Sequence, residues 1–205
     1  MAIQTWFPTS IYSETLMPKG LKVFNRDLLE QCYLVRDTDE AGQEWSSTHY
    51  PNGYTSYGSL TDLHVRYPHF EELRCAIDKH ARKLARYLEM DLQDGRLEMS
   101  SCWVNIMPMH TVHSLHLHPL SVLSGTYYVD VPKGTSAIKF EDPRLASMMA
   151  APPKLPGARP RNEQFVSLQA VAGQVIMWES WLRHEVPPNP SKADRISISF
   201  NYDWK

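Results

Sequence analysis

The feature that most constrains the fold of this chain is a change of texture after Gly95. From that point to the C-terminus, short segments rich in β-branched and aromatic residues follow one another, separated by residues that favour turns. The segments "EMSSCWVNIM", "VLSGTYYVDVP" and "RISISFNYDW" are typical of them. Because no further strong helical pattern occurs in this half, the sequence predicts an antiparallel β-sandwich or barrel.

The first half of the chain predicts helices instead. Residues 68–90 begin with Pro68, which suits the first turn of a helix, and continue with apolar side chains at helical spacing. Residues 19–38 show a weaker pattern of the same kind. Residues 43–62 are rich in Ser, Thr, Gly and Tyr, which predicts a long ordered loop. Residues 3–16 have the composition of an edge strand.

Together these patterns predict a mainly β fold with N-terminal helices, in the α+β class. We expect one domain of residues 1–205, in which residues 1–95 form a helical and loop-like support and residues 96–205 form the β core. A length of 205 residues suffices for one domain with a sizeable core. A proline-rich insertion, residues 143–162, interrupts the β part, and long insertions are often lids or binding loops.

Composition and charge exclude several classes of protein. The formal net charge is -2 and the charges are scattered, so no surface for nucleic acid or membrane is expected. The three cysteines are far apart, which argues against a disulfide framework. The start "MAIQTWFPTS" has neither the basic nor the apolar region of a signal peptide, so we do not expect it to act as one, and no apolar run reaches the roughly 18 residues of a membrane span. We therefore expect a cytoplasmic protein.

Histidines gather in the stretch "HSLHLHP", residues 113–119. In a strand, residues i and i+2 point the same way, so His116 and His118 share one face. Imidazole is a common neutral ligand of iron, zinc and copper, and two imidazoles on a face that lines a barrel could begin a metal site. His113 has the opposite parity, which predicts a supporting or solvated position. The alternative is a set of surface histidines on a polar strand face.

A metal site needs a third ligand, and His184 is the strongest candidate because it follows a hydrophobic segment and precedes two prolines. Further along, "RISISFNYDW" places Arg195 and Ser197 on one face of a strand. An arginine on an inward face is costly unless it meets an anion, and a guanidinium beside a hydroxyl can bind a carboxylate. The alternative is an ordinary strand with an exposed arginine.

The combination of H-x-H, a distal His and R-x-S resembles the 2-oxoglutarate- and iron(II)-dependent oxygenases, and it looks most like a bacterial branch related to the prolyl hydroxylases. The matching segments "HLHP", "LSGTYYVDVP", "AVAGQVIMWESWLRHEVPPN" and "RISISFN" cover about residues 100–202. The resemblance implies a double-stranded β-helix, a jelly-roll barrel. It also implies Fe(II) as the metal, 2-oxoglutarate as the cosubstrate, and hydroxylation of a substrate with release of succinate and CO2.

Carried over residue by residue, the resemblance predicts the metal ligands His116, His118 and His184. His118 stands where the family has Asp or Glu, so the site would contain three neutral imidazoles. The iron centre would then keep one more positive charge, which should favour an anionic chelator and alter the redox tuning of the metal.

The resemblance also predicts the residues that bind the cosubstrate. Arg195 would pair with the far carboxylate of 2-oxoglutarate, and Ser197 would support it. Tyr128, in "TYYV", would hydrogen-bond the same carboxylate. Asn105 is a weaker candidate for this pocket, because a strand-end asparagine explains it equally well.

Two other functions stay open. One is a three-His cupin-type metalloenzyme that does not use 2-oxoglutarate, such as a thiol dioxygenase-like enzyme or an isomerase. That reading lacks the glutamate expected after the H-x-H and leaves Arg195 and Ser197 unexplained. The other is a non-enzymatic barrel with a structural zinc, for which four-ligand closure would be expected.

The sequence does not name the substrate, which could be a small molecule, an amino-acid residue of a protein, or a nucleobase. We expect residues 42–60 and the insertion 143–162 to decide it. An exposed edge strand near the N-terminus could pair two copies in a homodimer.

Overall fold

The computed structural model describes residues 3–205 of the chain. The helices in chain order are α1 (Leu21–Thr38), α2 (Glu40–His49), α3 (Leu63–Arg66) and α4 (Pro68–Tyr87), with short 3-10 helices η1 (Ser56–Gly58), η2 (Leu145–Met148) and η3 (Pro160–Asn162). The strands are β1 (Ile11–Thr15), β2 (Tyr54–Thr55), β3 (Leu97–Met107), β4 (His113–His116), β5 (Leu123–Asp130), β6 (Ile138–Glu141), β7 (Phe165–Leu168), β8 (Gln174–Glu179), β9 (His184–Val186) and β10 (Arg195–Trp204).

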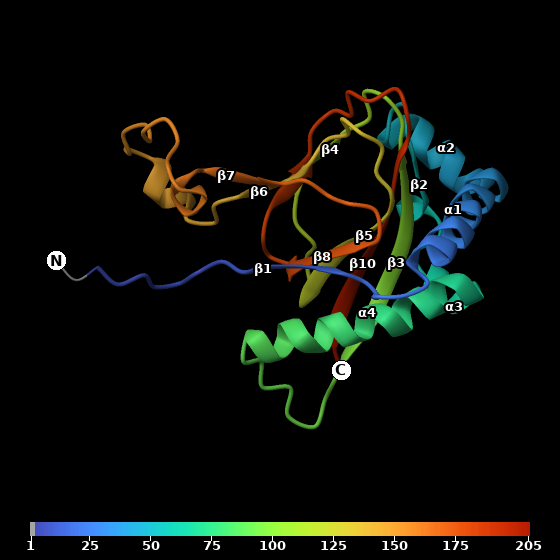
Figure 1. The fold of residues 1–205 in the computed structure, drawn as a ribbon, viewed down its shortest axis with the longest axis horizontal. Helices are drawn as coiled ribbons and strands as arrows, with labels where there is room; N and C mark the ends of the chain where they lie inside the picture. Colours follow the sequence, from blue (N-terminus) through green and yellow to red (C-terminus); the bar gives the residue numbers. More distant parts are fainter. Residues whose placement is uncertain (1–2) are drawn as a thin grey trace.

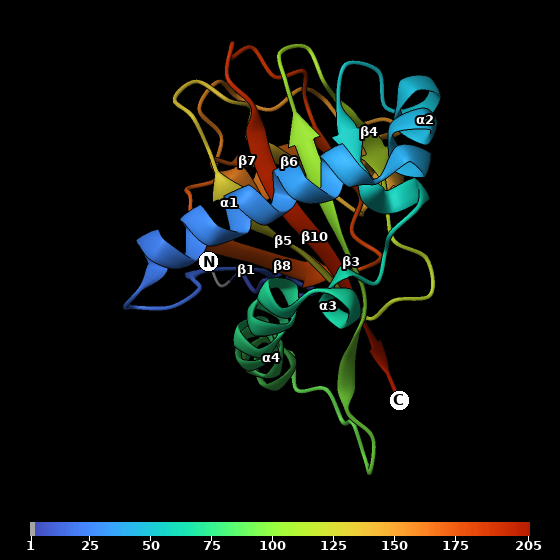
Figure 2. The ribbon, with the colours of Figure 1, turned by 90° about the vertical axis from the view of Figure 1, so that its right-hand side faces the viewer.

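The strands form two antiparallel sheets. The larger has the order β1-β8-β5-β10-β3-β2, and the smaller has the order β4-β9-β6-β7. Sheet partners are far apart in the sequence, as the pairing of β1 with β8 and of β4 with β9 shows. Helices α1 and α4 lie across one face of the larger sheet (Figures 1 and 2). This mainly β arrangement with N-terminal helices confirms the predicted fold class.

Period-two alternation in the central strands separates two cores. On β5, Tyr127 belongs to the core under the helices, whereas Tyr128 belongs to the core between the sheets. On β8, Val175 faces the helices and Ile176 faces the smaller sheet. The face of the larger sheet that turns away from the helices therefore looks into the space between the sheets, where the candidate site lies.

The helix α4 agrees with the predicted helix at residues 68–90, and α1 agrees with the one at residues 19–38. The prediction of a loop over residues 43–62 is wrong in its first part, because α2 extends to His49. Its start is stabilised by Asp39, whose carboxylate accepts a hydrogen bond of 3.0 Å from the backbone N–H of Gly42. This cap offsets the low helix propensity of the Ser and Thr residues that suggested a loop.

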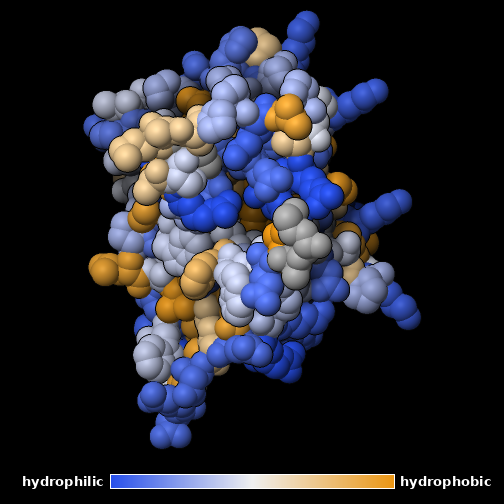
Figure 3. Space-filling model, turned by 90° about the vertical axis from the view of Figure 1, so that its left-hand side faces the viewer, coloured by the Kyte–Doolittle hydropathy of each residue, from blue (hydrophilic) through white to orange (hydrophobic). Residues whose placement is uncertain are grey.

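The insertion 143–162 connects β6 to β7 and extends away from the sheets together with the N-terminal segment (Figure 1). On the face of the molecule that carries them, apolar and polar side chains are interspersed (Figure 3). β1 lies at an edge of the larger sheet, which confirms the predicted edge strand. Among the described helices, none is long and apolar enough to cross a membrane.

Candidate metal and cosubstrate site

Two of the predicted ligands face each other across neighbouring strands. His116, the last residue of β4, is the register partner of His184, the first residue of β9. The centroids of their rings are 4.3 Å apart. Trp178 packs edge-on against the His184 ring at 4.6 Å and is buried, which keeps this side of the cluster dry.

Backbone carbonyls orient both rings. The Nδ1 atom of His116 lies 2.6 Å from the carbonyl oxygen of Ser114, and Nδ1 of His184 lies 3.1 Å from that of Leu182. A carbonyl oxygen only accepts, so each Nδ1 must carry the proton in these hydrogen bonds. The Nε2 lone pairs of these two rings are then free to bind a metal, because metal-binding histidines usually donate their other ring N–H to a carbonyl or carboxylate.

His118 joins this pair although it lies beyond the end of β4. Its backbone N–H donates to the carbonyl of Ser180 at 3.1 Å, which ties this segment to the turn before β9. Its Nε2 lies 3.4 Å from Nε2 of His184. Two nitrogens held at right angles by one ion at about 2.1 Å would lie about 3 Å apart. One ligand atom from each of His116, His118 and His184 can be chosen so that all lie within 4.8 Å of one another.

Burial keeps the three imidazoles neutral. Desolvation lowers the pKa of His184 to about 2, with a smaller contribution from His116, and it lowers the pKa of His118 to about 4. The pKa of His116 is lowered for the same reason. A metal must displace protons from any ligand that is protonated, so a cluster that is already neutral near pH 7 is ready to bind one.

Arg195 is the first residue of β10 and is only 1% exposed. Its guanidinium carbon lies 4.9 Å from the centroid of the Tyr128 ring, and Nη1 lies 3.2 Å from the sulfur of Met107. Among the described residues, Nε of Arg195 has no hydrogen-bond partner. A buried charge without a counter-ion is costly, so this position calls for an anion from outside the chain.

The other predicted cosubstrate residues lie in one row across the sheet. Ser197 is the register partner of Tyr128 on one side and of Asn105 on the other. The hydroxyl of Tyr128 is buried and has no partner among the described residues, and burial raises its pKa while Arg195 opposes this shift. The amide of Asn105 is already engaged: it accepts from Thr55 at 2.8 Å and donates to Ser199 at 3.0 Å.

All seven predicted site residues line one pocket, with a cavity volume of about 440 Å³. This size suits a small ligand. The structure adds residues that the sequence did not single out, and these come from several elements, among them α2, η1, β3, β5 and β10. The added lining residues include Trp45, Tyr50, Tyr57, Trp103, Thr126 and Ser199. Of the two segments expected to shape the pocket, residues 42–60 line it, whereas no described residue of the insertion 143–162 does.

His113 also lines this pocket. In a regular strand it would face the opposite side from His116, because the two residues are three positions apart. The register of β4 against β9 shifts between His113 and His116, so two residues of β4 oppose one of β9. This bulge turns both histidines to the same side. His113 has a supporting position, because its Nε2 lies 2.6 Å from the hydroxyl of Tyr50. Burial lowers the pKa of His113 to about 3.

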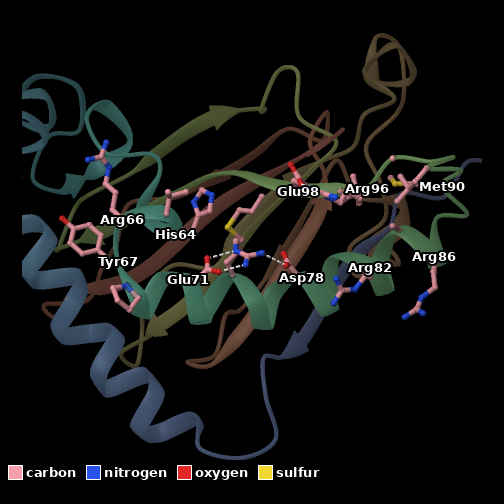
Figure 4. Close-up of a pocket in the computed structure, with 18 residues that line it drawn as sticks. His64, Arg66, Tyr67, Glu71, Asp78, Arg82, Arg86, Met90, Arg96 and Glu98 are labelled. Atoms are coloured by element: carbon pink, nitrogen blue, oxygen red, sulfur yellow. Dashed lines mark hydrogen bonds and ion pairs between the residues drawn. The ribbon is translucent and has the colours of Figure 1, made fainter.

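A larger groove, of about 1090 Å³, lies between α4 and the start of β3 (Figure 4). It is lined by several arginines, of which Arg74 is neutralised by two carboxylates of the groove. Arg74 lies 2.6 Å from Glu71 and 2.7 Å from Asp78. Of the described residues, the only set of three potential metal ligands is the histidine cluster of the other pocket. Size alone therefore does not identify the functional site.

The histidine pocket fits both groups that the resemblance implies. Three neutral imidazoles, two of them oriented through Nδ1 by backbone carbonyls, suit a divalent transition metal. The unpaired guanidinium and phenol beside them suit a carboxylate. These are properties of the residues themselves and do not depend on any relative.

Comparison with known proteins gives one family match. Residues 101–201, about half of the chain, match the family described as "Putative 2OG-Fe(II) oxygenase". None of the curated proteins matches this sequence at a significant level.

Several solved structures share the fold. A prolyl-4-hydroxylase of Pseudomonas putida superposes with a TM-score of 0.63 at 14% identity, covering 95% of this chain and 92% of that one. The epimerase SnoN from nogalamycin biosynthesis gives 0.67 at 14% identity over 95% and 76% of the two chains. HygX from Streptomyces hygroscopicus, solved with nickel, 2-oxoglutarate and hygromycin B bound, gives 0.63 at 14% identity over 95% and 83%.

These relatives have the double-stranded β-helix fold, so the predicted jelly-roll architecture is confirmed. At such low identity they show the fold and not the reaction, and their names include a hydroxylase and an epimerase. The family match covers the part of the chain that contains the three histidines and Arg195. The chain thus belongs to the 2-oxoglutarate- and iron(II)-dependent oxygenases, whose cofactor is Fe(II) and whose cosubstrate is 2-oxoglutarate.

Proposed function

We propose that this oxygenase is a hydroxylase in which His116, His118 and His184 hold Fe(II). Bound Fe(II), together with 2-oxoglutarate and O2, supplies the oxidising power to functionalise a C–H bond of the substrate, with succinate and CO2 as coproducts. The contribution of the chain is to orient the ligands through the carbonyls of Ser114 and Leu182.

Arg195 carries the proposal for 2-oxoglutarate. It is buried beside the histidine cluster, and no aspartate or glutamate is among the described residues that line the pocket. We assign it to the far carboxylate of the cosubstrate, with the hydroxyls of Tyr128 and Ser197 as further hydrogen-bond donors. Asn105 then has a positioning role, because its amide links β3 to Thr55 and Ser199 and holds the floor of the pocket.

The test is turnover of 2-oxoglutarate in the absence of a known substrate. Purified protein with Fe(II), ascorbate and air should convert 2-oxoglutarate slowly to succinate, measured by proton NMR, and Arg195→Met should reduce this rate strongly. Asp203→Asn, on the same strand but outside the pocket, serves as the control. If the protein is saturated with iron but forms no succinate from 2-oxoglutarate at millimolar concentrations, the proposal is refuted.

A three-His metalloenzyme that does not use 2-oxoglutarate is the second candidate, and His118 in place of a carboxylate is the observation that favours it. Oxygen uptake with small thiols, in the absence of 2-oxoglutarate, tests this candidate. We rank it second because it leaves the buried charge of Arg195 without a counter-ion. We also propose that the protein is cytoplasmic and that two copies pair through the edge strand β1.

A further inference from the structure

The mouth of the histidine pocket has an aromatic wall, formed by Trp45 from α2, Tyr57 from η1 and Trp103 from β3. The ring centroids of Trp45 and Tyr57 are 6.3 Å apart, and those of Tyr57 and Trp103 are 5.3 Å apart. The Trp103 ring in turn lies 5.8 Å from that of His118. The wall therefore runs without a break from the surface to a proposed metal ligand.

Gly58 allows η1 to pack closely against Trp45. A Cβ atom at Gly58 would lie 2.3 Å from the ring of Trp45, so only glycine allows η1 to lie directly on that ring. The contact sets the position of Tyr57, the residue before it.

Three apolar or aromatic side chains at the mouth of the pocket are partly exposed. Tyr57 is 54% exposed, and Val112 and Leu117, from the segment that carries the histidines, are 41% and 40% exposed. All three line the pocket. Exposed apolar groups at the entrance of a pocket mark a surface that a ligand covers.

The charge of the pocket restricts that ligand further. Of the described residues that line it, none is Asp, Glu or Lys, and Arg195 is the one that always carries a charge. Fe(II) would bring two positive charges and 2-oxoglutarate two negative ones, so the loaded pocket keeps one net positive charge. A carboxylate at position 118 would cancel it, but this chain has a neutral imidazole there. The field inside the pocket therefore disfavours cations and favours anions.

We propose that the substrate is a small planar-ring anion, such as an aromatic carboxylate, whose ring stacks against Tyr57 and Trp103. This inference rests on the proposed function. Aromatic pairs prefer offset or edge-to-face contacts with centroids about 4.5–7 Å apart, and the exposed part of Tyr57 is available for such a contact with a ligand ring. Substrates with a free amine are selected against, because the pocket offers them no counter-ion.

The test uses matched probes on the protein loaded with Ni(II), a redox-inert substitute, and 2-oxoglutarate. The probes are 3-phenylpropionate, 3-cyclohexylpropionate and 3-phenylpropylamine, titrated by calorimetry. The phenyl acid should bind about three- to tenfold more tightly than the cyclohexyl acid. The amine should bind at least about tenfold more weakly than the phenyl acid, which corresponds to one repelled unit charge in a partly buried site.

Variants separate the two parts of the proposal. Tyr57→Ala should remove the preference for the planar ring, whereas Tyr57→Phe should retain it. Tyr87→Ala is the matched control. Tyr87 is an exposed tyrosine at the end of α4 and does not line the pocket. His118→Asp should reduce the preference for the acid over the amine.

These titrations can show whether the inference about the substrate fails by itself or whether the proposed function fails as well. Titration with 2-oxoglutarate alone comes first, and absence of binding there would overturn the proposed function and this inference with it. If 2-oxoglutarate binds, then equal affinity for the two acids, a preference for the amine, or no binding of any probe would overturn the inference alone.

Discussion

The molecule contains two environments for a partly or fully buried arginine, and they differ in how the charge is neutralised. In the groove beside α4, Arg74 is 28% exposed and lies between Glu71 and Asp78 (Figure 4). In the histidine pocket, Arg195 is 1% exposed and has no acidic neighbour among the described residues lining the pocket. The charge of Arg74 is therefore neutralised within the chain, whereas that of Arg195 calls for an anion from outside. This difference is the reason why we propose that the smaller cavity is the functional one.

The largest expected effect is on the affinity for 2-oxoglutarate, which should depend on Arg195 and not on Arg74. Arg195→Met should weaken binding of 2-oxoglutarate to the Ni(II)-loaded protein by about 2–5 kcal/mol, which is at least about thirtyfold in Kd. Arg74→Met should leave that Kd unchanged within about twofold, because its charge is neutralised in the groove. Isothermal titration calorimetry measures both. Equal losses in the two variants would remove the basis of the comparison.

The same two variants should shift stability in opposite directions. Without ligand, Arg195→Met replaces an unpaired buried charge with an apolar side chain and should be neutral or stabilising, by about 1–4 kcal/mol. Arg74→Met breaks two partly exposed ion pairs and should destabilise by about 1 kcal/mol or less. Urea unfolding of the metal-free proteins tests this. A marked loss of stability in Arg195→Met would mean that the chain itself already satisfies that charge.

The two regions should also lose stability in different pH ranges. Burial lowers the pKa of His184 to about 2 and of His118 to about 4, whereas an unfolded histidine titrates near pH 6.5. Between these values the unfolded chain binds more protons, so stability falls as the pH drops from about 7 to about 4. The slope is about 1.4 kcal/mol per pH unit for each imidazole that stays neutral.

In the groove the direction is the same but the range is lower. Hydrogen bonds from Arg74 lower the pKa of Glu71 below its ordinary value of 4.5, so its contribution is present above that pH and is lost below it. Urea unfolding of metal-free protein at pH 7, 6 and 5 separates the two ranges. His118→Gln should reduce the slope above pH 5, and Glu71→Gln should not. A flat profile between pH 7 and 5 would contradict the neutral histidine cluster.

The smallest effect concerns a single hydrogen bond. Tyr50→Phe removes the 2.6 Å contact with His113 and should cost about 1 kcal/mol of stability. Tyr67→Phe, in the groove, is the matched control, since its hydroxyl has no hydrogen-bond partner among the described residues. The two proteins should differ in the midpoint of thermal unfolding. Identical midpoints would show that His113 is supported by its packing alone.

The strands and the faces of their side chains could be predicted from the sequence, because each depends on local periodicity. Alternation along "RISISFNYDW" places Arg195 and Ser197 toward the pocket and Ile196 and Ile198 toward the helices, as the structure shows. His184 was chosen because it follows a hydrophobic segment and precedes two prolines, and in the structure it is the register partner of His116.

Other features depend on contacts that no local pattern records. The bulge that turns His113 into the pocket arises from the pairing of β4 with β9. Simple alternation of side chains along β4 does not predict it. His118 lies beyond the strand end and is held by a hydrogen bond to Ser180. The aromatic wall combines residues from α2 and β3, which only the tertiary fold brings together.

The central claim is that the three histidines hold iron at a place where 2-oxoglutarate can chelate it beside Arg195. The most direct measurement is the visible absorption of the anaerobic Fe(II) protein on addition of 2-oxoglutarate, with His184→Ala measured in parallel. The claim predicts a weak metal-to-ligand charge-transfer band in the wild-type protein that His184→Ala abolishes. Stoichiometric iron in the wild-type protein without this band, or a band that persists unchanged in His184→Ala, would contradict it.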